Sequence, residues 1–464
     1  YQTRRGDIKR VNGKGESMTF ETKGKENNGA TYGRRSDWQD LYSIAKKYYE
    51  ALLADPGNAL FHLTDPRGAS DKSGRTFNNP YQYFFEQMHM DDAIYADESI
   101  YEYPMQQGGG NDGRPYSFGR PSSGGSKAAY PCKSYGQGRI NPAYFYGVFD
   151  PNDMRRDVSI TMTGSNGKGV EKLIPFVPNS KAEGGGLTLN KWDENRQANP
   201  WVAAQRKSGI NGPYMRMSEV YLGYAEVCAA LGDVVTGKQY LKTVRERSFP
   251  QGLANTDAFI ASFGNDLVRA IIEERGFEYA GEGDRRWTLI RSGYLPEDIK
   301  RIKDMTKAMM DGLATKGYYE FENGNIISAY IWTKLVDAKT IYGHRLTAQC
   351  PTDKVNDPVL YPGWRGQKDN WEEMGLNYGS STPATNLAIK GLFEIVSEEE
   401  AASLESQGYT KVNWGIDLVD NRDEYDKYLF WDYDYVSAPI YLWPFTPNVM
   451  AAGGFTNGYG FKQE

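Results

Sequence analysis

Apolar residues recur at helical spacing near the start of the chain, between residues 36 and 54. Ser36 and Gln39 have the spacing of a capping box, in which a serine caps a helix and a glutamine three residues later reaches back to it. Asp55-Pro56-Gly57 closes the pattern, because such residues end helices. The spacing predicts an amphipathic helix over 36–54, with an apolar face made of Trp38, Leu41, Tyr42, Ala45, Tyr48, Tyr49 and Leu52.

The same periodicity returns in the middle of the chain. Its cleanest stripe begins at Met217 and stops before Gly232. We expect consecutive antiparallel pairs of the tetratricopeptide type, although no strict repeat of about 34 residues can be laid over the sequence. With the first helix, these form the scaffold of a mostly α fold; the helices are predicted over 214–231, 236–247 and 266–280, within a scaffold segment 214–293.

Alternating apolar residues indicate only a few short strands. Val158, Ile160 and Met162 predict one half-buried strand, and a hairpin is expected around the turn Glu322-Asn323-Gly324. Elsewhere glycine, proline, serine and aromatic residues dominate. We therefore expect loop-rich, ligand-facing regions over 103–142 and 295–437 and an extended tail over 438–464, where prolines interrupt both helix and strand.

Composition and charge argue against several classes of protein. The 464 residues include 54 Lys and Arg against 60 Asp and Glu, a net charge of −6, and no arm or helix concentrates the basic residues, so we expect no nucleic-acid partner. No apolar run approaches the roughly 20 residues of a membrane span. The three cysteines and three histidines are scattered, and the acidic run 431–435 lacks calcium-loop spacing. We expect no metal and no cofactor.

Aromatic residues are the strongest indication of a ligand site. The chain has 34 Tyr and 10 Trp, and sugar rings stack their apolar faces on such side chains while polar neighbours bind the hydroxyl groups. Two loop regions combine both kinds of residue. The predicted binding residues are Tyr116, Tyr130 and Tyr135 in the first, beside Phe118, Asn111, Asp112, Arg114 and Arg120, and Tyr361, Trp364, Arg365, Asn370, Trp371 and Tyr378 in the second, beside Lys368 and Asp369.

The second region carries the clearer signal. Pro362-Gly363 before Trp364 favours an exposed turn, where a tryptophan has little structural role. The alternative for both regions is that these aromatics cover the helical core beneath long loops. Other tryptophans stand in helical or otherwise structured patterns and are assigned to the core: Trp38, Trp201, Trp287 and Trp443.

Residues 273–293 combine a charged helix, a glycine-bracketed turn and the start of a second charged helix. Acids and arginines alternate around the turn, and arginine neighbours lower the pKa of carboxylates, which suits ion pairs better than proton donation. We therefore expect a structural ion-pair cluster and no catalytic residue here; its members are Glu278, Glu282, Asp284, Arg285, Arg286 and Arg291.

Four stretches follow one another in a distinctive order. Arg155-Arg156-Asp157 follows Asp153, residues 214–226 contain R-x-x-E-x-x-L-x-x-A-E, residues 241–247 are similar to L-N-x-V-R-x-R, and 273–293 follow. In these stretches the chain resembles the SusD/RagB family of outer-membrane nutrient-binding lipoproteins, most clearly over 130–294. Thr288 replaces the Asp of the pattern D-L-x-R, and 455–459 lack the Gln and Pro of the family's ending L-T-Q-N-P-G-Y, which concerns the subfamily rather than the family.

The resemblance implies a SusD-like fold and a binding protein rather than an enzyme. Such a protein sits at the cell surface as a lid on a SusC-like, TonB-dependent outer-membrane transporter and passes an oligosaccharide or a peptide into it. Family members carry a lipidated N-terminal cysteine and further helices, after which this chain is expected to begin. Two alternatives stay open: a peptide-binding, RagB-like member, and a helical glycoside hydrolase with a pair of catalytic acids.

Overall fold

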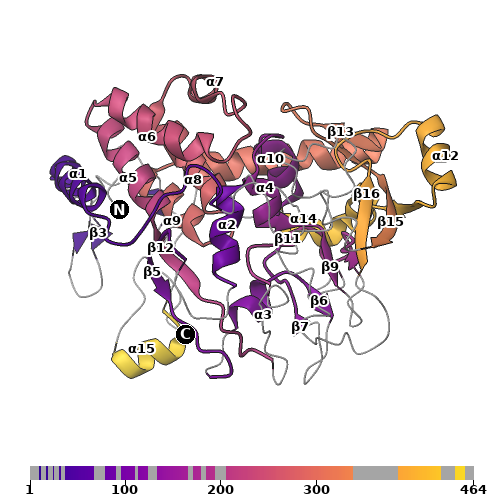
Figure 1. Ribbon diagram of the computed structural model, residues 1–464, viewed down its shortest axis with the longest axis horizontal. Helices are drawn as coiled ribbons and strands as arrows, with labels where there is room; N and C mark the ends of the chain where they lie inside the picture. The colour runs from indigo at the N-terminus through magenta and orange to yellow at the C-terminus, as the bar shows by residue number, and fades with distance from the viewer. Residues whose placement is uncertain are drawn as a thin grey trace.

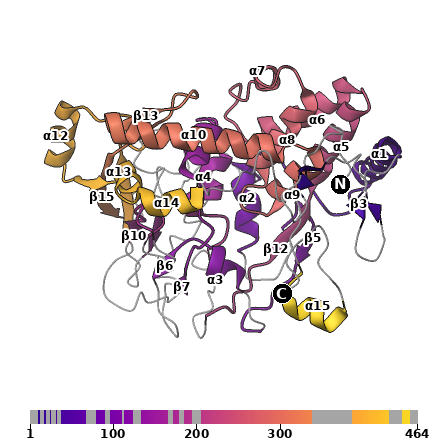
Figure 2. The ribbon, with the colours of Figure 1, turned by 180° about the vertical axis from the view of Figure 1, so that it is seen from behind.

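The computed structural model describes most of the chain between residues 37 and 429 and a short segment near its end. The described ranges are 10–11, 17–18, 24–25, 31–32, 37–66, 79–89, 96–109, 113–123, 133–165, 171–178, 184–193, 205–337, 385–429 and 445–454. Most of the longer helices lie along one side of the molecule, and several short strands lie below them in both views (Figures 1 and 2). The fold is mostly α, as the sequence predicted.

The predicted helical hairpins are present. Helix α5 (Met217–Ala230) and α6 (Val234–Glu246) run antiparallel, joined by a turn in which Gly232 has φ 91° and the Asp233 carboxylate caps α6. Helix α1 (Trp38–Ala54) packs on the other side of α5, and α8 (Leu267–Glu278) packs across the pair. Their shared apolar core includes Leu222, Ala225, Leu241, Val244, Ala270 and Ile271.

Two helix starts differ from the sequence prediction. Residues 214–216 belong to strand β12 (Gly212–Arg216) rather than to α5, because they pair with strand β5 (Ser99–Tyr103), a partner too distant in sequence for a local pattern to reveal. Helix α1 begins at Trp38, with Asp37 at the N-cap and no side-chain cap bond; Ser36 lies outside the described residues.

The expectation of irregular structure after residue 294 is wrong for its first part. Helix α10 (Leu295–Lys316) spans 22 residues, begins with Pro296 in its first turn and ends at Gly317, which has φ 77°. Its buried residues are Leu295, Asp298, Thr306, Met309, Met310 and Leu313. Lysines and acids four residues apart cover the exposed face, and this charge pattern hid the apolar stripe from the sequence reading.

A second core lies beneath α10 and is built from aromatic rings. Trp414 is fully buried there and donates from Nε1 to the Tyr146 hydroxyl at 2.7 Å. Strand β13 (Tyr318–Glu320) and β14 (Ile326–Ser328) form the predicted hairpin, and β15 (Tyr330–Asp337) pairs with β16 (Thr385–Lys390) and β17 (Thr410–Asn413). The rings include Phe145, Tyr146, Phe149, Phe176, Phe321, Phe393 and Trp414.

The remaining described elements are short. The helices are α2 (Pro80–Gln87), α3 (Arg114–Phe118), a π-helix (Tyr144–Val148), α4 (Arg155–Ser159), α7 (Thr256–Ala261), α9 (Asp284–Ser292), α12 (Glu398–Ser406), α13 (Gly415–Asp420), α14 (Arg422–Leu429) and α15 (Pro447–Gly453). The strands are β1 (Arg10–Val11), β2 (Ser17–Met18), β3 (Gly24–Lys25), β4 (Thr31–Tyr32), β6 (Ser122–Ser123), β7 (Lys133–Ser134), β8 (Ile160–Thr161), β9 (Thr163–Ser165), β10 (Glu171–Leu173) and β11 (Thr188–Leu189). In the described part of the chain, no helix has both the length and the apolar character to cross a membrane.

Three smaller predictions are corrected. Val158 lies in α4, and only Ile160 continues into β8, although both are buried. In the C-terminal segment, residues 447–453 form α15 instead of an extended tail. Pro447 is compatible with this helix because it occupies the first turn, where a backbone N–H would have no partner within the helix. Trp287 is 54% exposed, because α9 buries Leu289 and Ile290 on its other side.

We expect Leu241→Ala to lower the free energy of unfolding by about 2–5 kcal/mol, because it opens a cavity where α5, α6 and α8 meet. Val235→Ala, on the exposed side of the same helix, is the matched control and should change it by less than about 0.5 kcal/mol. Urea unfolding of both variants checks this; equal losses would show that the hairpin core does not lie on this face of α6.

Candidate ligand-binding surface

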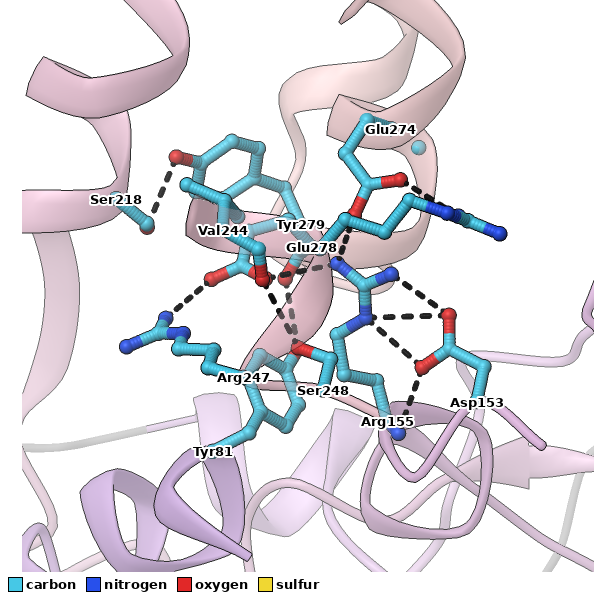
Figure 3. Close-up of polar contacts among 12 residues, drawn as sticks. Tyr81, Asp153, Arg155, Ser218, Val244, Arg247, Ser248, Glu274, Glu278 and Tyr279 are labelled. Atoms are coloured by element: carbon cyan, nitrogen blue, oxygen red, sulfur yellow. Dashed lines mark hydrogen bonds and ion pairs between the residues drawn. The ribbon is translucent and has the colours of Figure 1, made fainter. Parts of the chain in front are cut away.

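The charged segment 273–293 forms a buried ion network centred on Glu278. This carboxylate is fully buried and accepts hydrogen bonds from Arg216 at 2.5 Å, Arg247 at 2.8 Å and Arg155 at 3.0 Å. Figure 3 shows the Arg155 and Arg247 side chains on either side of Glu278, with Glu274 above Arg155. The arginines come from β12, the end of α6 and α4, so one carboxylate ties three distant segments to α8.

Further ion pairs extend this network along α8 and α9. Each acid of the segment pairs with arginines or a lysine, and most of these groups are buried. The pairs are Glu274 with Arg155 and Arg245, Glu282 with Arg216 and Lys191, Glu273 with Arg285 and Arg301, Asp284 with Arg275, and Glu226 with Arg291. The expectation of a structural ion-pair cluster is confirmed.

The electrostatics of the network fix its protonation. Burial by itself raises the pKa of Glu278, but the guanidinium groups of Arg216, Arg247 and Arg155 outweigh burial and hold that pKa far below the ordinary 4.5. Burial is also outweighed at Asp298, whose pKa Arg285 and Arg301 lower to about 2. These carboxylates stay ionised near neutral pH, so they are poor proton donors.

The two predicted aromatic regions are described to different extents. Every predicted residue of the second region, Tyr361, Trp364, Arg365, Asn370, Trp371 and Tyr378, lies outside the described residues, as does Tyr130 of the first. Tyr116 and Tyr135 are described, and their ring centroids lie 5.0 Å apart with the planes at 68°. Because Tyr116 is only 4% exposed, it can offer a ligand little more than its edge.

Two cations flank this tyrosine pair. The Arg206 guanidinium carbon lies 4.5 Å from the centroid of the Tyr116 ring, and the Lys133 ammonium lies 5.2 Å from that of Tyr135. Burial and a hydrogen bond with Tyr135 raise the pKa of Tyr116, while Arg206 acts in the opposite direction. The Tyr116 hydroxyl therefore stays protonated at neutral pH.

A second, more exposed aromatic group was not predicted from the sequence. Tyr101, Tyr103 and Tyr214, here called the tyrosine trio, lie on the ribbon formed by β5 and β12 and are 51%, 45% and 63% exposed. The Tyr214 ring meets the other two edge to face, with centroids 5.6 Å from Tyr101 and 5.2 Å from Tyr103. The trio thus offers ring faces and edges to solvent.

The backbone of the ribbon explains how the trio forms. Tyr101 and Tyr103 share one face of β5 because side chains alternate along a strand, and Glu102 between them points inward to Asn211 at 2.9 Å. The pairing of β12 shifts register between Pro213 and Met215, so Tyr214 stands opposite no residue of β5 and lies between the two rings. The alternation of Tyr101-Glu102-Tyr103 was readable in the sequence; the bulge was not.

The ribbon is anchored in the ion network. Arg216, the last residue of β12, binds Glu278 and also Glu98 at 3.0 Å, and Glu98 directly precedes β5. Arg114 closes the other end, 5.9 Å from the centroid of the Tyr103 ring and against Gly212, where a Cβ atom would overlap its guanidinium. Both strands are therefore fixed at the positions that present the trio.

These features define a helical-hairpin scaffold whose charged groups are buried and whose tyrosines are displayed. The chain belongs to the SusD family, whose sequence model matches residues 64–444. In the described residues no group of three or more His, Cys, Asp and Glu side chains is placed to hold a metal ion.

Individual relatives are distant. A SusD-like protein of Formosa agariphila is 28% identical over 160 residues, which are 34% of this chain and 26% of that protein. A SusD homologue of Bacteroides thetaiotaomicron has 16% identity and a TM-score of 0.37, with coverage of 57% of this chain and 55% of that one. Surface glycan-binding protein A of the same species, solved with laminarihexaose, has 18% identity and a TM-score of 0.37, with coverage of 56% and 52%. The chain spans about a quarter of the first relative (26%) and about half of the two structures (55% and 52%).

Glu278→Gln should lower the free energy of unfolding by about 3–5 kcal/mol, because it leaves buried arginines without their shared counter-charge. The control is Glu246→Gln on α6, which removes an exposed pair with Lys242 at 3.6 Å and should cost less than about 1 kcal/mol. Chemical unfolding at neutral pH measures both. A loss no larger than that of the control would show that the Glu278 network does not contribute to the stability of the fold.

The stability difference between wild type and Glu278→Gln should depend on pH. The folded-state pKa of Glu278 lies below 4.5, so its contribution is complete above that pH and is lost as pH falls toward the folded value. Glutamine does not titrate, and the two unfolding free energies should converge below about pH 4.5. Unfolding curves between pH 7 and 3 test this; a constant difference would contradict it.

Proposed function

We propose that this chain captures an oligosaccharide at the cell surface and hands it to a SusC-like, TonB-dependent transporter in the outer membrane, to which a lipid anchor ahead of this chain keeps it close. Membership of the SusD family over residues 64–444 carries this proposal. Capture would need only a binding surface, without bond cleavage.

The tyrosine trio is the surface that we assign to the sugar. Tyrosine rings offer apolar faces to the CH groups of a pyranose, and their hydroxyls bind its rim. Edge-to-face contacts and two short strands hold the rings before a ligand arrives, which limits the entropy lost on binding. The predicted second region, including Trp364 and Trp371, remains a candidate for additional stacking contacts.

The acids of the charged segment 273–293 support binding rather than hydrolysis. A glycoside hydrolase needs one carboxylic acid that is protonated near its working pH beside a second, ionised carboxylate. The carboxylates of this segment are instead paired with arginines, which lower the pKa of Glu278, Glu273 and Asp284. Burial by itself would raise the pKa of each of these carboxylates, but the nearby arginines outweigh it.

Replacing both Tyr101 and Tyr214 by alanine should weaken binding of the best glycan found in an array screen about tenfold or more, because each stacked ring contributes roughly 1 kcal/mol. Titration calorimetry measures the affinity. The control is Tyr48→Ala, which removes an isolated tyrosine that is 70% exposed on α1 and should leave affinity unchanged.

Thermal unfolding of the double variant should match wild type, since both rings are exposed. Unchanged affinity for every glycan would take the trio out of the binding site, and binding of peptides alone would favour the RagB-like alternative. New reducing ends after incubation with the bound glycan would show hydrolysis and overturn the proposal of capture alone.

A further inference from the structure

We infer that the captured saccharide is acidic, and that its carboxylate or sulfate substituent binds between Arg206 and Lys133 beside the Tyr116–Tyr135 pair. This inference rests on the proposed capture of a saccharide and specifies its chemical class. The cation cluster, as we call Arg206, Lys133, Tyr116 and Tyr135, lies apart from the buried ion network.

The two cations differ from the arginines of the network in having no acidic partner. Neither Arg206 nor Lys133 forms an ion pair within the described residues, whereas Arg155, Arg216 and Arg247 each bind one or more carboxylates. An exposed lysine is ordinarily satisfied by water. An arginine held against a ring is a different case, because the ring and a hydrogen bond with Tyr116 already order its side chain, and its remaining donors can bind an anion.

The backbone at Arg206 gives a second, independent indication. Its φ is 60°, in the left-handed region, which costs a residue with a Cβ atom about 1 kcal/mol relative to glycine. A residue other than glycine keeps a left-handed backbone conformation where contacts of the neighbouring residues hold it in place. Here the neighbouring Lys207 ammonium donates to the carbonyl of Gly109 at 3.2 Å, and the Ser208 hydroxyl accepts from the Ile210 amide at 3.1 Å, so the chain that follows Arg206 is held in place while Arg206 lies over Tyr116.

The arrangement matches the needs of an anionic substituent. Arg206 supplies guanidinium donors and Lys133 a compact positive charge, and both lie beside the tyrosine pair. Arg206 is exposed and Lys133 is half-buried, so both cations can be reached by an anion from solvent. Carboxylates and sulfate esters share this chemistry.

The position in the fold connects the cluster with the trio. Helix α3 lies between the β5–β12 ribbon and β7 in both views (Figures 1 and 2). Its first residue, Arg114, contacts Tyr103 of the trio, and its third, Tyr116, contacts Arg206 and Tyr135. An extended acidic oligosaccharide would therefore meet stacking rings on one side of α3 and counter-charges on the other.

The test compares acidic saccharides with their neutral counterparts. The probes are an oligogalacturonide and its carboxyl-reduced form, and a sulfated galactan oligosaccharide and its desulfated form. The variant is Arg206→Asn with Lys133→Gln, since asparagine tolerates the left-handed backbone at position 206. The control, Lys47→Gln with Lys316→Gln, removes the same charge from exposed positions on α1 and α10.

Calorimetry on wild type should show tighter binding of one acidic probe than of its neutral form, with an affinity that falls as salt rises. The double variant should lose about tenfold or more of the affinity for that acidic probe and none for its neutral form, whereas the control variant keeps both. Which of the two acidic probes responds identifies carboxylate or sulfate as the substituent.

Equal affinities of wild type for acidic and neutral probes, or an unchanged double variant, would overturn the anion site and leave saccharide capture standing. No binding of any saccharide, acidic or neutral, by wild type is a failure of the proposed function itself and removes this inference with it.

Discussion

Glu278 holds a negative charge where water is excluded, and arginines from α4, β12 and the end of α6 neutralise it. A buried ion pair adds little net stability over a well-packed apolar pair, but each partner becomes costly to leave alone. Only one arrangement of these segments satisfies all the charges. The network therefore contributes more to the specificity of the packing between the helices and the β5–β12 ribbon than to the free energy of unfolding. The ribbon, and with it the tyrosine trio, is positioned through this packing.

Charged residues of this chain fall into two groups, those that pair with each other inside the fold and those that lie at the surface. The acids of 273–293 are bound by arginines or a lysine within the protein, and Glu273, Glu274 and Glu278 are buried. What remains on the outside of the ribbon is aromatic, and beside it are two cations without acidic neighbours in the described structure. The outer surface can therefore bind without disturbing the charges on which the fold depends.

The sequence predicted elements whose signals are local and missed those that depend on distant partners. The α5–α6 hairpin follows from its apolar stripes and from Gly232, and the β13–β14 hairpin from Asn323-Gly324. The tyrosine trio was missed because it needs the bulge at Tyr214, which exists only once β12 pairs with β5, about 110 residues earlier in the chain. Trp287 was assigned to the core because it stands in a helical, structured segment, whereas α9 turns its side chain outward.

Helix α10 contacts α9 near its start and the β13–β14 hairpin and α13 near its end (Figure 2). Its buried residues are thus shared between the helical scaffold at one end and the β13–β14 hairpin with α13 at the other, and each part needs α10 to cover its hydrophobic core. A cut on either side of α10 would leave one fragment with an uncovered hydrophobic surface. The two halves are expected to melt together as a single cooperative unit, so a soluble fragment of this protein would have to retain both ends.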